Sequence, residues 1–203
     1  MTETTFNGNL CIGTSYDELS DKNKDEYKPE HWKFADKFPD GITEVKGNIA
    51  IFNQLPTIPK DLKIAGPVVF HNIEFKETDD LPFKKTASCI DFYDCYGILD
   101  LGGIDICGHL LIRGNADEKL KVRISEPAKI GTDFGFEANN ITRTVLKNLT
   151  AKNIHLMSGM THHIFPTVNA ERYYIGNKEY STLDEIYQER PGARPPEFKT
   201  QRG

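Results

Sequence analysis

The sequence predicts a mainly β protein, built as a parallel β-solenoid of about six coils with small caps of α and β structure at both ends. Three observations predict this fold. A short apolar pattern recurs six times between residues 45 and 160, the recurrences are 19, 22, 20, 24 and 20 residues apart, and the links between them lack the two-residue turn signals of β-hairpins. Links of a dozen or more residues suit parallel strands, although a meandering antiparallel sandwich remains the alternative.

Each recurrence has two apolar residues at alternate positions, as expected for a short strand with one buried face. The first of the two forms one column, Ile49, Val68, Ile90, Leu110, Phe134 and Ile154. The second forms another, Ile51, Phe70, Phe92, Ile112, Phe136 and Leu156. Because a single coil cannot bury its apolar side, we expect the six coils to stack so that both columns become continuous ladders.

The links between the strands also follow a pattern. The residue after each strand is mostly small or turn-forming, namely Asn53, Asn72, Asp94, Gly114, Ala138 and Ser158. Leu-Pro dipeptides at 55–56 and 81–82 stiffen the return of the first two coils. Later returns contain second strand candidates at 98–101, 120–124 and 141–146.

Residues 1–44 precede the repeat and are predicted to cap the open N-terminal end of the 45–160 solenoid. They contain a strand candidate at 9–13 and a helix expected from 16 to about 24, which begins with the capping box Ser15-x-x-Glu18. An aromatic cluster then follows, His31, Trp32, Phe34 and Phe38. Its expected role is to cover the first coil, with a ligand site as the alternative.

Residues 161–191 are predicted to form the C-terminal cap. The segment 172–181 indicates a hairpin around Gly176-Asn177, and Thr182-x-x-Glu185 indicates a helix that Pro191 closes. Residues 192–203 are polar, contain proline and are expected to be a mobile tail.

Composition narrows the function. Net charge is −5, with 25 basic and 30 acidic residues and no basic stripe, so general nucleic-acid binding is not expected. Neither a membrane-spanning run nor a signal peptide is apparent, which predicts a cytoplasmic protein or one delivered into another cell without a cleavable leader. The four cysteines show no zinc or redox spacing and are expected to be free, buried thiols.

The first coils resemble leucine-rich-repeat solenoids, particularly the short bacterial kind in which Leu-Pro precedes the strand. The likeness rests on residues 45–53, on Leu55-Pro56 and on residues 64–72, and it covers about half of the chain. One residue rather than two separates Phe70 from Asn72, and the inner column is rich in phenylalanine. These departures leave a right-handed parallel β-helix open. The resemblance implies a scaffold that binds other proteins through the exposed side of its strands.

The alternate positions of the predicted strands face outward. One outward column is Ala50, Val69, Asp91, Leu111, Gly135 and His155. The other is Phe52, His71, Tyr93, Arg113, Glu137 and Met157, stacked at intervals of about 4.8 Å. Tyr and Arg are enriched at interface hot spots, so we expect the second column, with Asp91 and His155, to bind another protein. The alternative is an ordinary surface with an Arg113–Glu137 cross-strand pair.

This hypothesis describes a non-enzymatic binder, such as an effector, an inhibitor or an immunity-type protein, with no cofactor. A carbohydrate-active β-helix enzyme that uses Asp91 and Glu137 is the alternative, since glycoside hydrolysis needs a carboxylate pair. A self-assembling structural solenoid is the third class, and a homo-oligomer stays open. His155, His162 and His163 lack a positioned carboxylate or cysteine, so no metal site is predicted, although their binding of a metal is left undecided.

Overall fold

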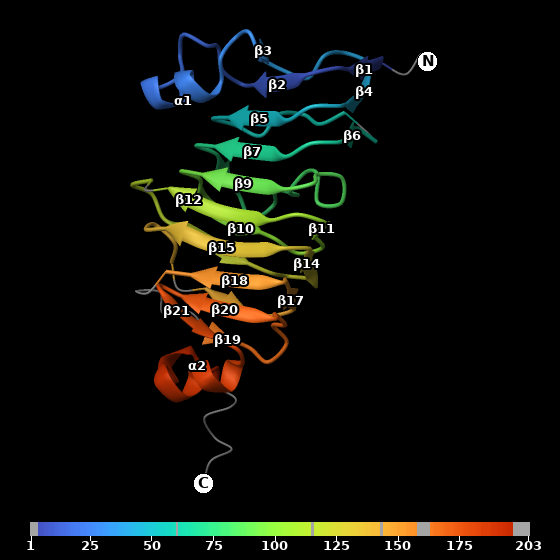
Figure 1. Ribbon diagram of the computed structural model, residues 1–203. Coiled ribbons are helices and arrows are strands. Elements are labelled where there is room, and N and C mark those ends of the chain that lie inside the picture. Colours follow the sequence, from blue (N-terminus) through green and yellow to red (C-terminus); the bar gives the residue numbers. More distant parts are fainter. Residues whose placement is uncertain (1–3, 60, 115, 143, 158–162, 197–203) are drawn as a thin grey trace.

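The protein forms a parallel β-solenoid of about 7 turns, with small helices at the C-terminal end (Figure 1). The structure is a computed structural model that describes residues 4–59, 61–114, 116–142, 144–157 and 163–196. It is 41% strand and 9% helix. The predicted fold class is therefore confirmed, and the antiparallel sandwich is excluded.

One long sheet runs the length of the molecule. In the described part of the chain it has ten strands, in the spatial order β21, β20, β18, β15, β12, β9, β7, β5, β2 and β3. Their bounds are β2 Asn9–Ile12, β3 Trp32–Ala35, β5 Ile49–Phe52, β7 Val68–His71, β9 Ile90–Tyr93, β12 Leu110–Gly114, β15 Asp133–Ala138, β18 Asn153–Leu156, β20 Arg172–Ile175 and β21 Lys178–Tyr180. Neighbours are parallel, except that β21 runs antiparallel to β20.

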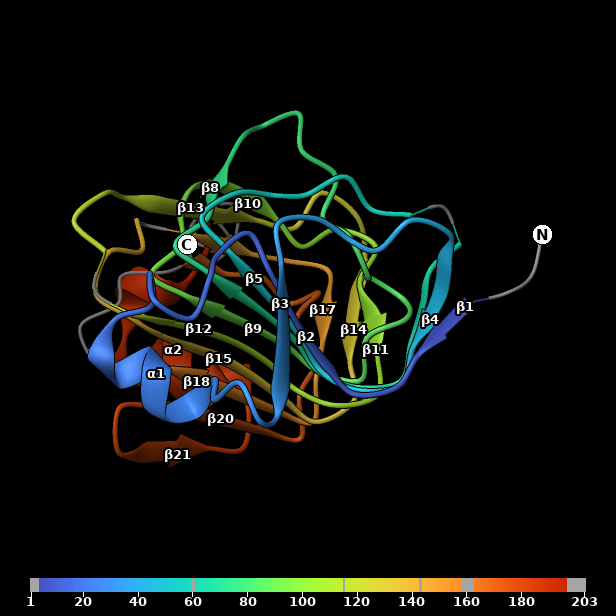
Figure 2. The same ribbon diagram turned by 90° about the horizontal axis from the view of Figure 1, so that it is seen from above.

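Shorter sheets form the other sides of the coil, as the view down the stack shows (Figure 2). Two of them are β1 Thr4–Phe6, β4 Ile42–Val45 and β6 Lys63–Ile64, and β8 Glu74–Phe75, β10 Tyr96–Asp100 and β13 Leu120–Arg123. The others are β11 Asp105–Ile106, β14 Ala128–Ile130 and β17 Leu149–Thr150, and β16 Val145–Leu146 with β19 His163–Ile164. The second strands expected at 98–101, 120–124 and 141–146 correspond to β10, β13 and β16.

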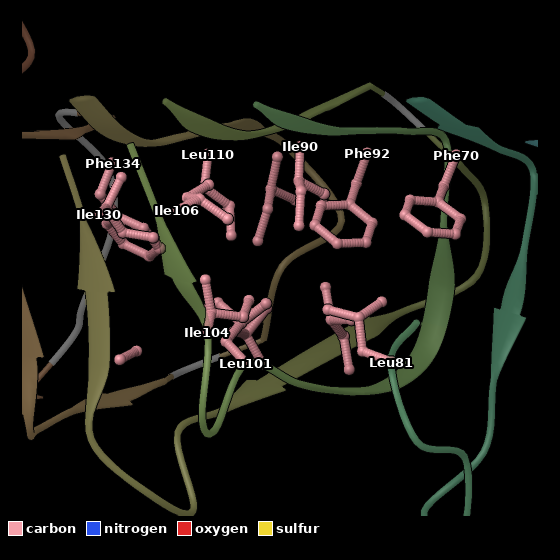
Figure 3. Close-up of a cluster of buried hydrophobic side chains, with 14 of the residues drawn as sticks. Phe70, Leu81, Ile90, Phe92, Leu101, Ile104, Ile106, Leu110, Ile130 and Phe134 are labelled. Atoms are coloured by element: carbon pink, nitrogen blue, oxygen red, sulfur yellow. The ribbon is translucent and has the colours of Figure 1, made fainter. Parts of the chain in front are cut away.

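The two predicted apolar columns face the interior and stack in register. Ile90, for example, pairs with Val68 and Leu110, and Phe92 pairs with Phe70 and Ile112. Every member of both columns is at most 6% exposed. The rings of Phe70 and Phe92 lie stacked with centroids 5.2 Å apart (Figure 3). Full burial of such a side chain stabilises the fold by roughly 1.5–3 kcal/mol, so these ladders supply much of the driving force.

The long sheet extends beyond the six predicted strands. Leu10 and Ile12 of β2 continue the two columns at one end, and Tyr173 and Ile175 of β20 continue them at the other. The solenoid therefore has about 7 turns, where the repeat in the sequence predicts about six coils. The 36 residues between β2 and β5, 13–48, interrupt the period at one end of the sheet. At the other end the sequence predicts β20 as part of a hairpin with β21, and the structure shows that β20 also joins the long sheet.

The residues expected to turn the chain after the strands have left-handed backbone where they are Asn, Asp or Gly, whereas Ala138 is the last residue of β15 and does not. The φ angles of Asn53, Asn72 and Asp94 are 65°, 53° and 53°, and that of Gly114 is 118°. Asn and Asp tolerate this region better than other residues because their short side chains form local hydrogen bonds. Asn72 Nδ2 donates to Asn53 Oδ1 on the preceding turn, over 3.1 Å.

The N-terminal helix is shorter and later than predicted. Ser15 and Glu18 do interact, with Ser15 N and Oγ both donating to Glu18 Oε2, but residues 16–19 form only a turn. Helix α1, Asp21–Glu26, begins after Ser20, whose Oγ accepts a hydrogen bond from Asn23 N. Ser15 and Ser20 are thus both capping residues, five positions apart, but only Ser20 is followed by a helix.

The aromatic cluster of the N-terminal segment is divided between two places. Phe38 is buried in the interior core, whereas Trp32 and Phe34 of β3 pack on the outer side of the long sheet. Strand β3 itself lies at the end of the sheet beside β2. The cluster thus covers an end and an outer face together, rather than an end alone.

The C-terminal segment follows the prediction in detail. Gly176, with φ of 62°, links β20 to β21. Helix α2, Leu183–Glu189, has Thr182 as its N-cap, and the 3-10 helix Pro191–Ala193 follows it. Ile186 of α2 is fully buried and Tyr187 donates its hydroxyl hydrogen bond to Ile164 O, so the helix closes the last turn. Most of the predicted tail, residues 197–203, lies outside the described residues.

Within the described residues, none of the helices has both the length and the apolar character required to cross a bilayer.

Candidate binding face

The outer side of the long sheet carries three columns of side chains. Each strand contributes positions that alternate with the buried ones, so parallel register aligns them across the sheet. Two columns are those predicted from the sequence. The third column lies two residues before the outward column that contains Asp91 and Leu111. It includes Cys89, His109, Asp133, Asn153 and Arg172.

The N-terminal half of this outer side is covered. Phe52 is 4% exposed and His71 is 8% exposed, because residues 15–31 pack over the outer side of this part of the sheet. Viewed down the stack, α1 lies outside the long sheet (Figure 2). The expectation that these two residues face solvent is therefore wrong. Their burial follows from a segment whose path has no period in the sequence.

A second hydrophobic cluster fills the space beneath this covering segment. It consists of Cys11, Leu19, Tyr27, Ala50 and Phe52, with Tyr16, Trp32 and Phe34 packed against it. Tyr27 is 1% exposed and lies edge-on to Phe52 and Trp32. The apolar outward side chains of β2 and β5 thus pack against apolar side chains of the covering segment. Burial of this apolar surface explains why the segment packs at this position.

The C-terminal half of the outer side is not covered by this segment, and we call it the open face. It consists of His109, which immediately precedes β12, and of the outward side chains of β9, β12, β15, β18 and β20, namely Asp91, Tyr93, Leu111, Arg113, Asp133, Glu137, Asn153, His155, Arg172 and Tyr174. All are half-buried or exposed. Met157, just beyond β18, is 36% exposed.

A chain of contacts crosses the middle of the open face. Arg113 donates from Nε to Glu137 Oε2 over 2.8 Å and from Nη1 to the Tyr93 hydroxyl over 3.1 Å. Tyr93 in turn stacks on His71, with centroids 5.1 Å apart. The predicted Arg113–Glu137 cross-strand pair is confirmed, and the two residues lie opposite each other in the pairing of β12 with β15. These contacts hold the guanidinium and the phenol ring in fixed positions.

Asp91 lies beside this chain and is the most buried carboxyl of the open face. Its side chain is 16% exposed, and His109 Nε2 lies 3.3 Å from Oδ1 and 3.4 Å from Oδ2. Burial raises the pKa of Asp91 above its ordinary value, although His109 and Arg113 act in the opposite direction. Oδ1 is buried, and its 3.3 Å contact with His109 lacks hydrogen-bond geometry.

A second pair of histidine and aspartate lies two strands further along. Asp133 Oδ1 accepts hydrogen bonds from Asn153 Nδ2 over 2.9 Å and from His155 Nε2 at 3.1 Å. Burial alone would raise the pKa of Asp133, but these hydrogen bonds bring it below its ordinary value. The His155 ring stacks on Tyr174, with centroids 4.6 Å apart.

The centre of the open face has no side chain. Gly135 lies between Leu111 and His155 in the same column, and a Cβ atom there would lie 2.7 Å from Leu111 Cδ2. The Leu111 side chain therefore leans over the glycine backbone. Gly135 is itself buried, and the Leu111 side chain covers part of its backbone.

The structure gathers six of the eight predicted site residues on the open face or at its margin, and buries the other two. It also adds His109, Asp133 and Tyr174, which the sequence reasoning missed. A signal for the first two was present, because each lies two residues before a member of the outward column that includes Leu111 and Gly135. Tyr174 required knowledge that β20 adds to the sheet.

The histidines considered for a metal site do not meet as a group in the described residues. His155 pairs with Asp133, His163 lies on β19, and His162 falls outside the described residues. Among the residues described, no three or more His, Cys, Asp and Glu side chains are grouped to hold a metal ion.

All four cysteines are free, but their burial differs from the expectation. Cys11 and Cys95 are buried, Cys89 is half-buried and Cys107 is exposed. Burial raises the pKa of each buried thiol to about 12, so neither is a reactive thiolate.

The fold places the chain in the class of parallel β-solenoid proteins, with one face of its long sheet open and polar. Comparison with family models, curated proteins and solved structures finds no match for the chain. The open face is therefore interpreted from its own chemistry.

Proposed function

We propose that the protein is a binding scaffold that recognises another protein through the open face. The observation that supports this most is the fixed chain Tyr93–Arg113–Glu137 in the middle of a rigid sheet. Because these side chains are already ordered by their contacts, little conformational entropy is lost when a partner binds. Tyr and Arg in such positions are the residue types that dominate interface energetics.

The surroundings of this chain also suit a protein partner. Exposed Met157 and half-buried Leu111 and Tyr174 supply apolar area between the charged groups. Apolar area interspersed with polar and charged groups is the usual composition of a non-obligate interface. An effector, an inhibitor or an immunity-type protein would each act by binding another protein. For the location we propose the cytoplasm, or delivery into another cell without a cleavable leader.

Within the solenoid class, we propose a coil of the β-helix kind rather than a leucine-rich repeat. The motifs that carry the likeness to leucine-rich repeats lie in the first turns, between residues 45 and 72. The later turns carry further short strands on their other sides, such as β10 and β11 between β9 and β12. Such additional strands favour the β-helix alternative.

The experiment compares partner capture by the wild type with capture by the Tyr93→Ala, Arg113→Ala double variant. Truncation of interface hot spots costs about 2 kcal/mol or more each, so we expect the complex to be lost. Lys121→Ala is the matched control, because Lys121 is exposed on β13 of another sheet. A complex that survives in the double variant, or is lost equally in the control, would refute the use of this face.

Asp91 provides an observation in favour of a second candidate, a carbohydrate-active enzyme. A carboxyl whose pKa is raised by burial suits a general acid, and Glu137, which is paired with Arg113, would be the second carboxyl group. The test is polysaccharide cleavage, with Asp91→Asn and Glu137→Gln each expected to abolish it without changing the circular dichroism spectrum. Cleavage that persists in both variants would eliminate this candidate.

A further inference from the structure

The covered half of the outer side depends on very few anchors. We call residues 15–31 the cover. Its helix α1 has no buried residue, and its buried apolar side chains are Leu19 at 6% exposure and Tyr27 at 1%. An element with so few buried contacts is drawn from the low-stability part of a fold and can open while the rest stays folded.

The stronger anchor, Tyr27, is joined to the sheet by a buried hydrogen bond to a titratable group. Tyr27 Oη lies 2.7 Å from His71 Nε2, and the bond spans 44 positions of the sequence. The His71 ring is stacked between Phe52, at a centroid distance of 4.4 Å, and Tyr93, at 5.1 Å. His71 thus lies at the boundary between the cover and the open face.

We propose that the cover is an acid-sensitive lid, which detaches from the outer side of β2, β5 and β7 when His71 takes up a proton. In the closed arrangement neutral Nε2 can accept the Tyr27 hydroxyl hydrogen. A protonated ring has a hydrogen on that nitrogen, so the bond cannot keep this direction, and a positive charge would lie buried among aromatic rings.

The ionisable groups around His71 offset only a part of the cost of burying this charge. Burial lowers the pKa of His71 from its ordinary 6.5 to about 4, Asp94 acts to raise it and Lys22 of α1 acts to lower it. Cys11, Glu26 and Tyr93 surround Tyr27, whose own pKa is raised by burial. Tyr27 and Cys11 are therefore neutral in the pH range of interest.

The sign of the pH effect follows from this lowered pKa. His71 takes up its proton in the open state at about its ordinary pKa, but in the closed state only near the lower value. Closure is thus fully favoured above the ordinary value and weakens as the pH falls toward 4. Each pH unit in that window multiplies the ratio of open to closed lid by up to about tenfold.

Opening would expose the apolar outward side chains of the first strands. Cys11, Ala50 and Phe52 would become accessible, and they continue the columns of the open face. Acid would thereby extend the surface available to a partner. This consequence rests on the proposed function, whereas opening itself does not.

Three residues report lid opening separately from unfolding. Trp32 is the only tryptophan and lies against Tyr27, with centroids 4.8 Å apart. Cys11 is buried beneath the lid, whereas Cys95 is buried at 2% exposure in the interior core. Labelling with a pyridyl disulfide, which reacts with thiols in mild acid, can be resolved for each cysteine by mass spectrometry.

The experiment measures Cys11 labelling and Trp32 fluorescence of the full chain from about pH 7 to about pH 5. The expected result is a rise of at least tenfold in the labelling rate of Cys11 relative to that of exposed Cys107, a parallel change in fluorescence and continued protection of Cys95. An unchanged ratio of Cys11 to Cys107 labelling would overturn the proposal, and so would Cys11 and Cys95 becoming reactive together, because that indicates global unfolding.

Two variants test whether His71 is the group responsible. His71→Gln can accept the Tyr27 hydrogen bond without titrating, and the Tyr27→Phe, His71→Phe double variant replaces both partners by apolar rings. Both are expected to keep Cys11 equally protected at both pH values. An acid response that persists in these variants would overturn the role of His71, and none of these outcomes depends on whether a partner binds the open face.

Discussion

Asn72 shows how a single residue directs the chain around a corner of the coil. Its φ of 53° lies in the left-handed region, and its amide bridges to Asn53 of the preceding turn. Glycine adopts this region without steric cost, and asparagine does so with little. A β-branched residue there places its Cβ too close to the backbone carbonyl.

We therefore expect Asn72→Gly and Asn72→Val to differ in stability. The glycine variant should remain within about 0.5 kcal/mol of the wild type, since it loses only an exposed hydrogen bond. The valine variant should lose about 1–2 kcal/mol of unfolding free energy, through backbone strain. Urea denaturation measures both, and equal losses in the two variants would show that the side-chain bridge matters more than the backbone angle.

At the scale of the element, β3 shows how the N-terminal end of the long sheet is closed. Lys33 of β3 pairs with Leu10, which belongs to one of the two inward-facing columns. Lys33 therefore continues that column at the end of the sheet, where its side chain is exposed. Its Nζ lies 5.6 Å from the centroid of the Phe6 ring. An inward-pointing charge on an edge strand prevents another sheet from adding to that edge. This argues against the self-assembling solenoid.

Replacement of this charge should therefore promote association. Lys33→Val extends the apolar column to the end of the stack, and we expect sedimentation velocity to show a dimer whose fraction rises with concentration. Lys121→Val, an exposed substitution on β13, is the control and should sediment like the wild type. If Lys33→Val behaves as the control does, then the edge is blocked by something other than this lysine.

At the scale of the whole molecule, each turn contacts mainly the turns beside it. Phe134 of β15 is fully buried and pairs with Leu110 on one side and Ile154 on the other. In such a linear stack, stability is approximately a sum of terms for each turn and for each interface between neighbours. A defect in one turn should weaken nearby turns most.

Phe134→Ala should cost about 3–5 kcal/mol locally. In native-state hydrogen exchange we expect protection to fall most in β12, β15 and β18 and least in β2. A variant with an exposed change on the same strand, Glu137→Ala, should leave protection unchanged. An equal fall in every strand would instead show that all turns unfold as one cooperative unit.

Much of this architecture could be predicted because its signals are local or periodic. The two apolar columns repeat at nearly constant spacing, so their burial and their parallel register followed from the alternation of side chains along a strand. The C-terminal hairpin and helix were equally predictable, because Gly176 and Thr182 act on their immediate neighbours.

Features that depend on contacts distant in sequence could not be obtained in this way. The pairs of His109 with Asp91 and of His155 with Asp133 cross between strands, so they require the register as well as the strands. The outward column that begins at Phe52 is buried there, although its members from Tyr93 onward are half-buried or exposed. The alternation of apolar and polar residues does not reveal this difference.

By itself, then, the sequence determined that the chain is a parallel β-solenoid and which side chains of its strands point inward. Only the tertiary structure decided which part of the outer side is open. The physical reason is that a periodic pattern encodes the direction of each side chain, whereas exposure depends on what packs above it. At Phe52 and His71 that is Tyr27, brought there by a segment without a repeat.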